Sequence, residues 1–187
     1  MRADALRRRN TIIATASRLF QEHGSTVTLE KIAEESGVGI ATLYRNFSSK
    51  PELIRACSEY LGREFLAFQE EMISGYTPGA DHLRTYANKL RTMGLNILIP
   101  AFVPSDLEEL DPELKTLGEK LMSHGDKFIR LGQQHGEIGP GVTHFEFIVG
   151  LLALARPRAV HVEAFEPDIE EHMVDLYLAG IRAGHAG

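Results

Sequence analysis

The chain has 187 residues, of which 43% are hydrophobic and 25% are charged, and its formal net charge is −6. This composition is typical of a globular protein and excludes a largely disordered chain. The longest apolar run, residues 145–155, is interrupted by Glu146 and is too short to span a bilayer, so we expect a cytoplasmic protein without a membrane partner. The single cysteine, Cys57, excludes an intramolecular disulfide framework and agrees with a reducing compartment.

The first predicted element is an amphipathic helix that follows three consecutive arginines at residues 7–9. Gly24 is expected to end this helix, because glycine readily adopts the left-handed conformation found after helix C-termini. The apolar residues that recur at helical spacing predict one buried face, and they are Ile12, Ala16, Leu19 and Phe20.

Two short helices joined at a glycine turn are predicted within residues 27–50. Thr28 can cap the first helix, since its hydroxyl can accept a hydrogen bond from a free amide of the first turn. Gly37 is expected to end that helix, and the second helix should begin at residue 39 or 40. An ordinary helical hairpin inside a core would show the same periodicity.

The second of these short helices is anchored by two apolar residues four positions apart, Leu43 and Phe47, and its other side faces outward. The outward side chains are small, hydroxylic, aromatic, cationic and amide groups. Such groups can approach a DNA duplex closely and bond to phosphates and base edges. They are Ile40, Ala41, Thr42, Tyr44, Arg45 and Asn46.

Two features around this hairpin favour DNA binding. Ser48 or Ser49 can cap a further helix that has Pro51 in its first turn. Lys50 then lies at the helix start beside the groove, where its charge suits a phosphate. Residues 1–50 carry 8 Lys and Arg against 5 Asp and Glu, a net charge of +3, whereas the remainder has a net charge of −9. The basic end of the chain is therefore the predicted DNA reader.

The rest of the chain is predicted to be helical, without internal repeats. Apolar residues recur at helical spacing, and Gly, Pro and Asp residues mark where helices begin or end. A segment rich in prolines and acids, residues 99–112, is expected to be a surface connection, and residues 136–141 are expected to form a loop. The predicted helices cover residues 51–75, 81 to about 99, 113–134, 143–155 and 167–183.

The last two of these helices are the most apolar. Residues 143–155 are apolar nearly all round, which in so short a helix predicts burial on several sides. Residues 167–183 carry a broad apolar stripe. By pattern alone, both fit the core of a monomer.

An ordered set of residues runs through the first third of the chain. Its members are Leu19, Phe20, Gly24, Thr28, Ile32, Ala33, Gly37, Val38, Thr42, Leu43, Tyr44, Phe47, Lys50 and Leu53. As an ordered set this pattern is specific, and it resembles the TetR family of transcriptional regulators. Beyond about residue 60 the resemblance does not extend to any motif, as expected of a family whose ligand domains diverge.

The resemblance implies an all-α protein. An N-terminal helix-turn-helix head of three helices, residues 1–50, would be joined to a C-terminal helical ligand-binding and dimerisation core, residues 51–187. The family implies a homodimeric repressor that binds a palindromic double-stranded DNA operator and is released by a small-molecule effector. Positions that usually meet phosphates are Thr28, Thr42, Tyr44 and Lys50, and positions near the base edges are Gly39, Ile40, Ala41, Arg45 and Asn46.

Three positions depart from the residues common in the family. Gly39 stands where Ser is frequent, and it is a weaker cap without a hydroxyl for a phosphate. Ile40 stands where Lys is frequent, and it can contact a thymine methyl group but cannot bond to guanine. Asn46 stands where His is common. These departures concern which operator is read and not whether DNA is bound.

An effector pocket is expected inside the helices between residues 81 and 155, where the side chains suit an uncharged or weakly polar hydrophobic ligand. Each candidate is also explained as plain core. The pocket candidates are Tyr86, Met93, Asn96, Phe102, Met122, Phe128, His144 and Phe145. The resemblance favours a dimer in which the helices over residues 143–155 and 167–183 pair with their copies in a four-helix bundle. The residues expected at this interface are Phe147, Leu151, Leu154, Met173, Leu176 and Tyr177.

Catalysis, metal binding and a cofactor are not expected. The closest groupings of the scattered histidines, His135 with Glu137 and His161 with Glu163, lack a third ligand at metal spacing. No HExxH, GxSxG or phosphate-loop pattern occurs, and an enzyme with a helical pocket is only a weak alternative. The main alternative to a repressor is a sequence-tolerant DNA-organising or partner-binding protein with the same head, a filled core and no ligand response.

Overall fold

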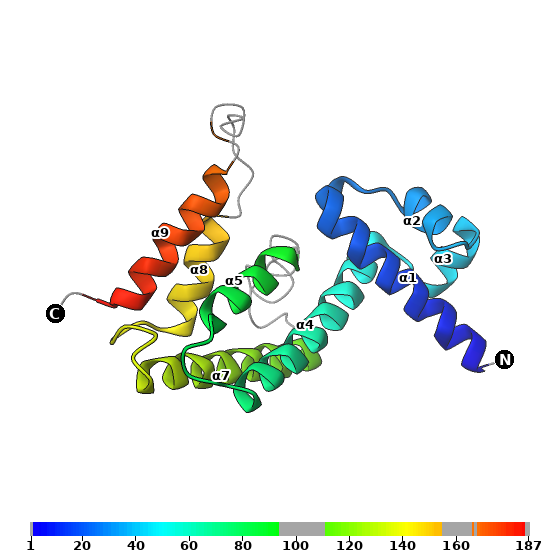
Figure 1. Ribbon diagram of the computed structural model, residues 1–187. Helices are drawn as coiled ribbons and strands as arrows, with labels where there is room; N and C mark the ends of the chain where they lie inside the picture. Colours follow the sequence, from blue (N-terminus) through cyan, green and yellow to red (C-terminus); the bar gives the residue numbers. More distant parts are fainter. Residues whose placement is uncertain (1, 94–110, 155–165, 167, 186–187) are drawn as a thin grey trace. The chain divides into compact units, whose positions relative to one another are not determined.

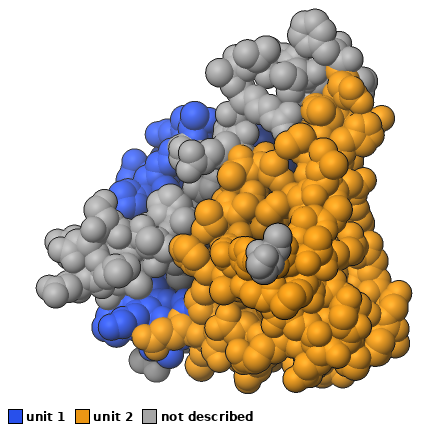
Figure 2. Space-filling model, turned by 90° about the vertical axis from the view of Figure 1, so that its left-hand side faces the viewer, with its two compact units in different colours: residues 1–65, 93–118 blue, residues 66–92, 119–187 orange. Residues whose placement is uncertain are grey.

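The computed structural model describes residues 2–93, 111–154, 166 and 168–185. All regular structure within these ranges is helical, which confirms the predicted all-α class. The chain divides into two compact units, residues 1–65 with 93–118 and residues 66–92 with 119–187 (Figure 2). None of the helices in the described ranges combines the length and the hydropathy that a membrane span needs.

The first unit contains the helices predicted at the start of the chain (Figure 1). A short 3-10 turn, Gly24–Thr26, connects the first two of them. The helix-turn-helix expected within residues 27–50 is present as two seven-residue helices. The helices are α1 (Arg2–His23), α2 (Leu29–Glu35), α3 (Ile40–Asn46) and α4 (Lys50–Ser74), and α4 contributes residues to both units.

The helices of the first unit begin and end at the capping and glycine residues that the sequence predicts. The Thr28 hydroxyl accepts a hydrogen bond from the backbone N–H of Lys31 at 3.2 Å and so caps α2. Gly24 and Gly37 follow α1 and α2 with φ angles of 69° and 67°, in the left-handed region that favours glycine. Gly39 is the N-cap of α3, and it supplies no side-chain hydrogen bond there.

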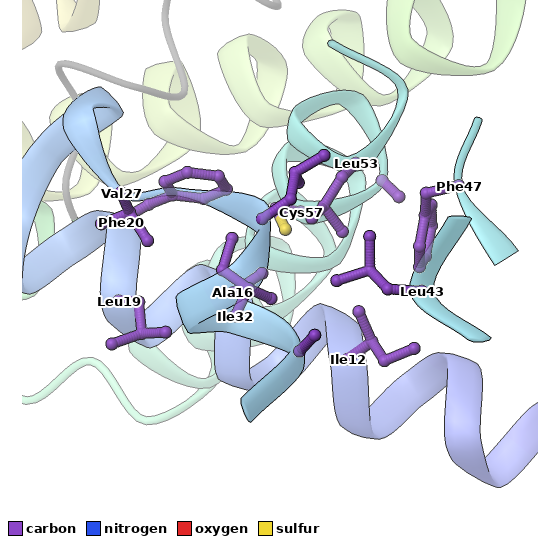
Figure 3. Close-up of a cluster of buried hydrophobic side chains, with 13 residues drawn as sticks. Ile12, Ala16, Leu19, Phe20, Val27, Ile32, Leu43, Phe47, Leu53 and Cys57 are labelled. Carbon is purple, nitrogen blue, oxygen red and sulfur yellow. The ribbon is translucent and has the colours of Figure 1, made fainter. Parts of the chain in front are cut away.

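The core of the first unit is built by α1, α2, α3 and the first turns of α4 (Figure 3). Leu43 and Phe47, the two predicted anchors of α3, are fully buried in it. Burial raises the pKa of the Cys57 thiol to about 11, so this cysteine is a core side chain rather than a reactive thiolate. The buried cluster consists of Ile12, Ala16, Leu19, Phe20, Val27, Leu29, Ile32, Ala33, Leu43, Phe47, Leu53, Ala56 and Cys57.

The second unit contains the last turns of α4, most of α7, and three further helices. The Thr143 hydroxyl accepts from the backbone N–H of Glu146 at 3.1 Å, and the Glu146 carboxylate accepts from the N–H of Thr143 at 2.8 Å. This reciprocal cap starts α8 at the predicted place. α8 packs against α5 and α9. The helices are α5 (His82–Thr92), α7 (Pro112–Gln134), α8 (His144–Leu154) and α9 (Ile169–Ala183).

Ion pairs join α5 to α9. Arg84 pairs with Glu171 and Asp175, and Arg91 pairs with Glu170 and with Glu171 at 2.8 Å. The hydrogen bond from Arg91 lowers the pKa of the Glu171 carboxyl group. Since all these side chains are partly exposed, each pair contributes little to stability, about 1 kcal/mol or less.

Within the described part of a single chain, α8 is buried on one side, and its predicted burial on further sides by a second copy stays a prediction. Phe147 and Leu151 are fully buried against the unit, whereas Phe145 and Val149 are 64% and 44% exposed. Only one face of α8 contacts the rest of the described unit, and no helix among the described residues covers its other apolar face. On α9, Leu176 is likewise 69% exposed. We call these three residues, Phe145, Val149 and Leu176, the outer apolar face.

The turn between α2 and α3 offers a matched pair of glycine variants. A Cβ added at Gly37 or at Gly39 would meet no atom within 4 Å, so the two sites differ in backbone conformation and not in space. We expect Gly37→Ser to lower the free energy of unfolding by about 1–2 kcal/mol, since its φ is positive. Gly39→Ser should raise that free energy by a few tenths of a kcal/mol, because a hydroxyl then caps α3. Urea denaturation of both variants measures the difference, and equal stabilities would contradict this account.

Candidate nucleic-acid interface

The outward side of α3 lies open on the first unit as the sequence predicts. Ile40, Ala41 and Arg45 are exposed, and Tyr44 is 48% exposed. Thr42 is half-buried at the edge of this face. Leu43 on the opposite side is fully buried, so the rotation of α3 about its axis is fixed by packing while its outer residues remain accessible.

Thr28 and Lys50 already make hydrogen bonds inside the first unit. The Thr28 hydroxyl accepts from the N–H of Lys31 as the α2 cap, and its own hydrogen remains a donor. The ammonium of Lys50 is half-buried and donates to the carbonyl oxygen of Val27 at 2.6 Å. Because an ammonium has three donors, this bond is compatible with a phosphate contact, but it also ties the start of α4 to the segment before α2.

Asn46 is half-buried at the end of α3, and its side chain turns back on its own helix. The amide nitrogen donates to the carbonyl oxygen of Thr42 at 2.8 Å. This bond uses one of the two amide hydrogens, whereas the side-chain oxygen is an acceptor that suits the amino group of cytosine or adenine.

Arg9 approaches the end of α3 from α1, a contact that the sequence analysis missed. Its guanidinium donates to the carbonyl oxygen of Asn46 at 2.8 Å and lies 4.2 Å from the centre of the Phe47 ring. In the sequence, Arg9 was interpreted only as one of three consecutive arginines before the first helix. Its spacing could have indicated the contact, because Arg9 lies three residues before the buried Ile12 and so shares a side of α1 with the core.

In the second unit, Tyr86 is the centre of a buried cluster. Its ring stacks on that of Phe128, with 4.4 Å between centroids, and its hydroxyl lies 2.8 Å from Nε2 of His144. Gln69 of α4 donates from Nε2 to the same hydroxyl at 2.5 Å and to the carbonyl oxygen of Leu121 at 3.1 Å. Three of the predicted pocket residues therefore lie together.

Gln69 was not among the predicted pocket residues. The signal for it was a polar residue in a core position, since Phe65 and Met72 lie four before and three after it on one face of α4 and are both buried. A glutamine at such a position needs hydrogen-bond partners, and Tyr86 and Leu121 supply them.

The burial of this cluster also sets the charge of its histidine. Burial lowers the pKa of His144 to about 4, so its ring is neutral at pH 7. Nε2 of Gln69 donates to the Tyr86 oxygen, whereas the direction of the hydrogen bond between the Tyr86 hydroxyl and Nε2 of His144 depends on the tautomer of the ring. Within the described part of the chain, Nδ1 of His144 and Oε1 of Gln69 have no hydrogen-bond partner.

The other predicted pocket residues do not join this cluster. Met93 is buried but belongs to the first unit, and Met122 is half-buried. The prediction for Phe145 is wrong, because its place on the side of α8 opposite the core leaves it exposed. Two candidates lie outside the described residues: Asn96 and Phe102.

The residues predicted at the dimer interface fall into three groups. Phe147 and Leu151 are buried inside the second unit, because they occupy the inner face of α8. Leu176 is exposed and belongs to the outer apolar face. The half-buried members are Leu154, Met173 and Tyr177.

One cavity of about 290 Å³ lies in the second unit, away from the Tyr86 cluster. Its charged lining residues are Asp81, Glu137 and Arg182, and Arg182 pairs with Asp81 at 2.8 Å. None of the predicted pocket residues lines it. No group of three or more His, Cys, Asp or Glu side chains suited to a metal ion occurs among the residues described.

The neutral buried His144 makes stability depend on pH in a defined window. Its pKa is about 4 when folded and about 6.5 when unfolded, so below pH 6.5 the unfolded chain binds a proton that the folded chain does not. This group should therefore lower the free energy of unfolding by roughly 3 kcal/mol as the pH falls from 7 to 4. In His144→Gln that contribution should vanish. Urea denaturation at several pH values measures it, with His23→Gln as the exposed control, and parallel curves for wild type and His144→Gln would contradict it.

The comparisons with known proteins agree with the geometry of the first unit. The family model "Bacterial regulatory proteins, tetR family" matches residues 12–57. The HTH-type transcriptional regulator SAB2452 of Staphylococcus aureus is 43% identical over 54 residues, which are 28% of this chain and 29% of that protein. The chain thus matches less than a third of the length of this curated relative.

Solved structures extend the likeness in fold to nearly the whole chain. The TetR transcriptional regulator SCO0520 from Streptomyces coelicolor has a TM-score of 0.65 at 24% identity, over 95% of this chain and 99% of that one. AibR, in complex with isovaleryl coenzyme A and operator DNA, has a TM-score of 0.58 at 16% identity, over 95% of this chain and 100% of that one. At such identities the likeness concerns the fold. Over residues 12–57 the chain is similar to the tetR family of bacterial regulatory proteins and to HTH-type transcriptional regulators.

Proposed function

We propose that the chain is a DNA-binding transcriptional repressor that acts as a homodimer on a palindromic operator and is released by a small hydrophobic effector. The observation that carries this proposal is the open outer face of α3 on a domain of the TetR type. The net charge of +3 in residues 1–50 supports it, because a basic surface is attracted to the phosphate backbone.

We assign DNA binding to residues 1–50 and ligand binding and dimerisation to residues 51–187. The compact first unit continues to residue 65 because Leu53, Ala56 and Cys57 of α4 belong to the same buried cluster as α1 to α3. The proposed boundary at residue 50 is therefore functional: α4 completes the core of the head, whereas the residues that meet DNA precede it.

The proposed DNA contacts divide into two groups. Side chains beside the groove meet phosphates and set the position of the head, whereas those on the exposed turns of α3 meet base edges and select the sequence. The exposed Ile40 offers a methyl contact to thymine, and the exposed Arg45 offers a bidentate donor to guanine. The phosphate group is Thr28, Thr42, Tyr44 and Lys50, and the base group is Gly39, Ile40, Ala41, Arg45 and Asn46.

The proposed dimer is formed by the outer apolar face meeting its own copy. Phe145 and Val149 on α8 and Leu176 on α9 are large apolar side chains that the single chain leaves exposed. A two-fold pairing of both helices would bury them in a four-helix bundle, and such a dimer presents two heads to half-sites about 34–36 Å apart. This places the centre of the interface on the outer apolar face rather than on Phe147 and Leu151, which the protomer buries.

The proposed effector enters the second unit and is uncharged or weakly polar. AibR, which shares the fold, was solved with isovaleryl coenzyme A and operator DNA, which supports regulation by a small ligand in a protein of this fold. In this chain the Tyr86 cluster combines aromatic rings with two buried polar atoms, Gln69 Oε1 and His144 Nδ1. A ligand that offers a donor to Gln69 Oε1 and a hydrogen-bond partner to His144 Nδ1 would satisfy both atoms.

Selection of bound duplexes from a random pool tests the DNA part of the proposal. We expect a palindromic consensus for the wild-type chain. Lys50→Ala should weaken binding to all duplexes and reduce the slope of log K against log salt by about 0.9, as the loss of one phosphate contact does. Arg45→Ala should cost about 1–3 kcal/mol on the selected site and relax the preference at one base position.

Repeating the selection with small molecules from a cell extract tests the effector, which should release the selected duplex. Equal affinity for unrelated duplexes, falling alike with salt, would replace the proposal by a sequence-tolerant DNA-organising protein. An unchanged consensus for Arg45→Ala would reduce that residue to a phosphate contact.

Analytical ultracentrifugation tests the dimer. Leu176→Glu or Phe145→Glu should convert a wild-type dimer into a folded monomer, because the new carboxylate would be buried without a partner in the interface and exposed in the monomer. Gln134→Glu, at an exposed position of α7, is the control for an added negative charge. A monomeric wild-type chain, or variants that dimerise as tightly as wild type, would refute this interface.

A further inference from the structure

We infer that Arg9 of α1 is a positioning residue that holds the C-terminal end of the recognition helix α3, and that it is not a phosphate contact of the DNA-binding face. The inference rests on the proposed function only in that α3 is the helix that reads DNA. It concerns how a helix of two turns acquires a defined orientation before DNA is present.

α3 has only seven residues, so its own hydrogen bonds cannot stabilise it. Its last carbonyl groups have no partners within the helix and must be satisfied from outside. The carbonyl oxygen of Leu43 accepts from the N–H of Phe47 at 2.9 Å, and that of Thr42 accepts from the Asn46 side chain. The carbonyl oxygen of Asn46, the last residue of α3, accepts from Arg9 at 2.8 Å.

The same guanidinium also covers the residue that ends α3. Phe47 leaves the helix with extended dihedral angles, φ −141° and ψ 110°, and its ring is fully buried. Arg9 lies over this ring at 4.2 Å from its centre, within the range of a cation–π interaction. Arg9 thus contacts the backbone of the last helical residue and the side chain of the next one.

The charge of Arg9 also has a partner inside the unit. Hydrogen bonds from the Ser48 hydroxyl and N–H lower the pKa of Glu52 at the start of α4, and the positive charge of Arg9 contributes to this lowering. A cation at a helix C-terminus is favoured by the helix dipole. Arg9 therefore lies at the end of α3 against the ring of Phe47, and it is half-buried, whereas Arg7 and Arg8 are exposed.

This placement matters for DNA reading because Tyr44, Arg45 and Asn46 lie on the last turn of α3. Fixing the Asn46 carbonyl group fixes the direction in which these side chains leave the helix. If the end of the helix is already ordered in the free protein, binding to the operator does not lose affinity to the entropy cost of ordering it.

The test compares three variants. Arg9→Met keeps apolar contact with Phe47 but loses the hydrogen-bond donor and the positive charge, whereas Arg9→Lys keeps the donor and the charge. Arg8→Met is the exposed control. Affinity is measured for the selected duplex and for an unrelated duplex over a range of salt concentrations. For Arg9→Met we expect about tenfold weaker binding to the selected duplex, a lower ratio of specific to non-specific affinity, and an unchanged salt slope. Arg9→Lys should restore most of the loss.

Hydrogen exchange of the α3 amides in the free protein is the second measurement. Exchange at residues 44–47 should be faster in Arg9→Met than in wild type and unchanged in Arg8→Met. This readout does not depend on DNA, so a wild-type chain that binds no duplex would end the proposed function but would leave the inference testable by exchange.

Three results would overturn the inference. A salt slope reduced by about 0.9, with equal losses on both duplexes, would make Arg9 a phosphate contact. An Arg9→Met protein with wild-type exchange and specificity would leave Arg9 without a role at α3. A uniform rise in exchange across the first unit, rather than at the end of α3, would show a general loss of stability.

Discussion

The head of this protein depends on the burial of Leu43 and Phe47 in a core that α3 does not itself build. α3 is too short to be stable alone, and it exists because these two side chains enter a cluster made by α1, α2 and α4. Their spacing of four residues turns one face of the helix inward and so determines which residues face outward. The caps at Thr28 and Gly37 bring the chain to this core in the required direction.

The second unit combines two kinds of contact. α8 and α9 pack through apolar side chains on their inner faces and leave Phe145, Val149 and Leu176 exposed on their outer faces. α5 is joined to α9 by exposed ion pairs and to the interior by Tyr86. In the polar interior around Tyr86, the amide of Gln69 donates to the Tyr86 hydroxyl and to the carbonyl oxygen of Leu121.

The sequence predicted the helices of both units well, because their boundaries depend on local chemistry. Gly24, Gly37 and Thr28 act through backbone conformation and adjacent amides, so a single sequence contains the necessary information. The outward face of α3 followed from the same reasoning. Arg9 and Gln69 were missed because their roles depend on residues 37 and 17 positions away, Asn46 and Tyr86, which periodicity cannot bring together. Phe145 was assigned to the interior because apolar character alone does not tell which side of an apolar helix is covered.

The burial of Cys57 has a practical consequence. It is the single thiol of the chain, it is buried in the core of the head, and its pKa of about 11 leaves almost no thiolate at neutral pH. In the native protein this thiol should therefore react very slowly with thiol-reactive reagents. A cysteine introduced at the surface of either unit could carry a spin label or a fluorophore selectively, without removal of the natural thiol from the core on which the recognition helix depends.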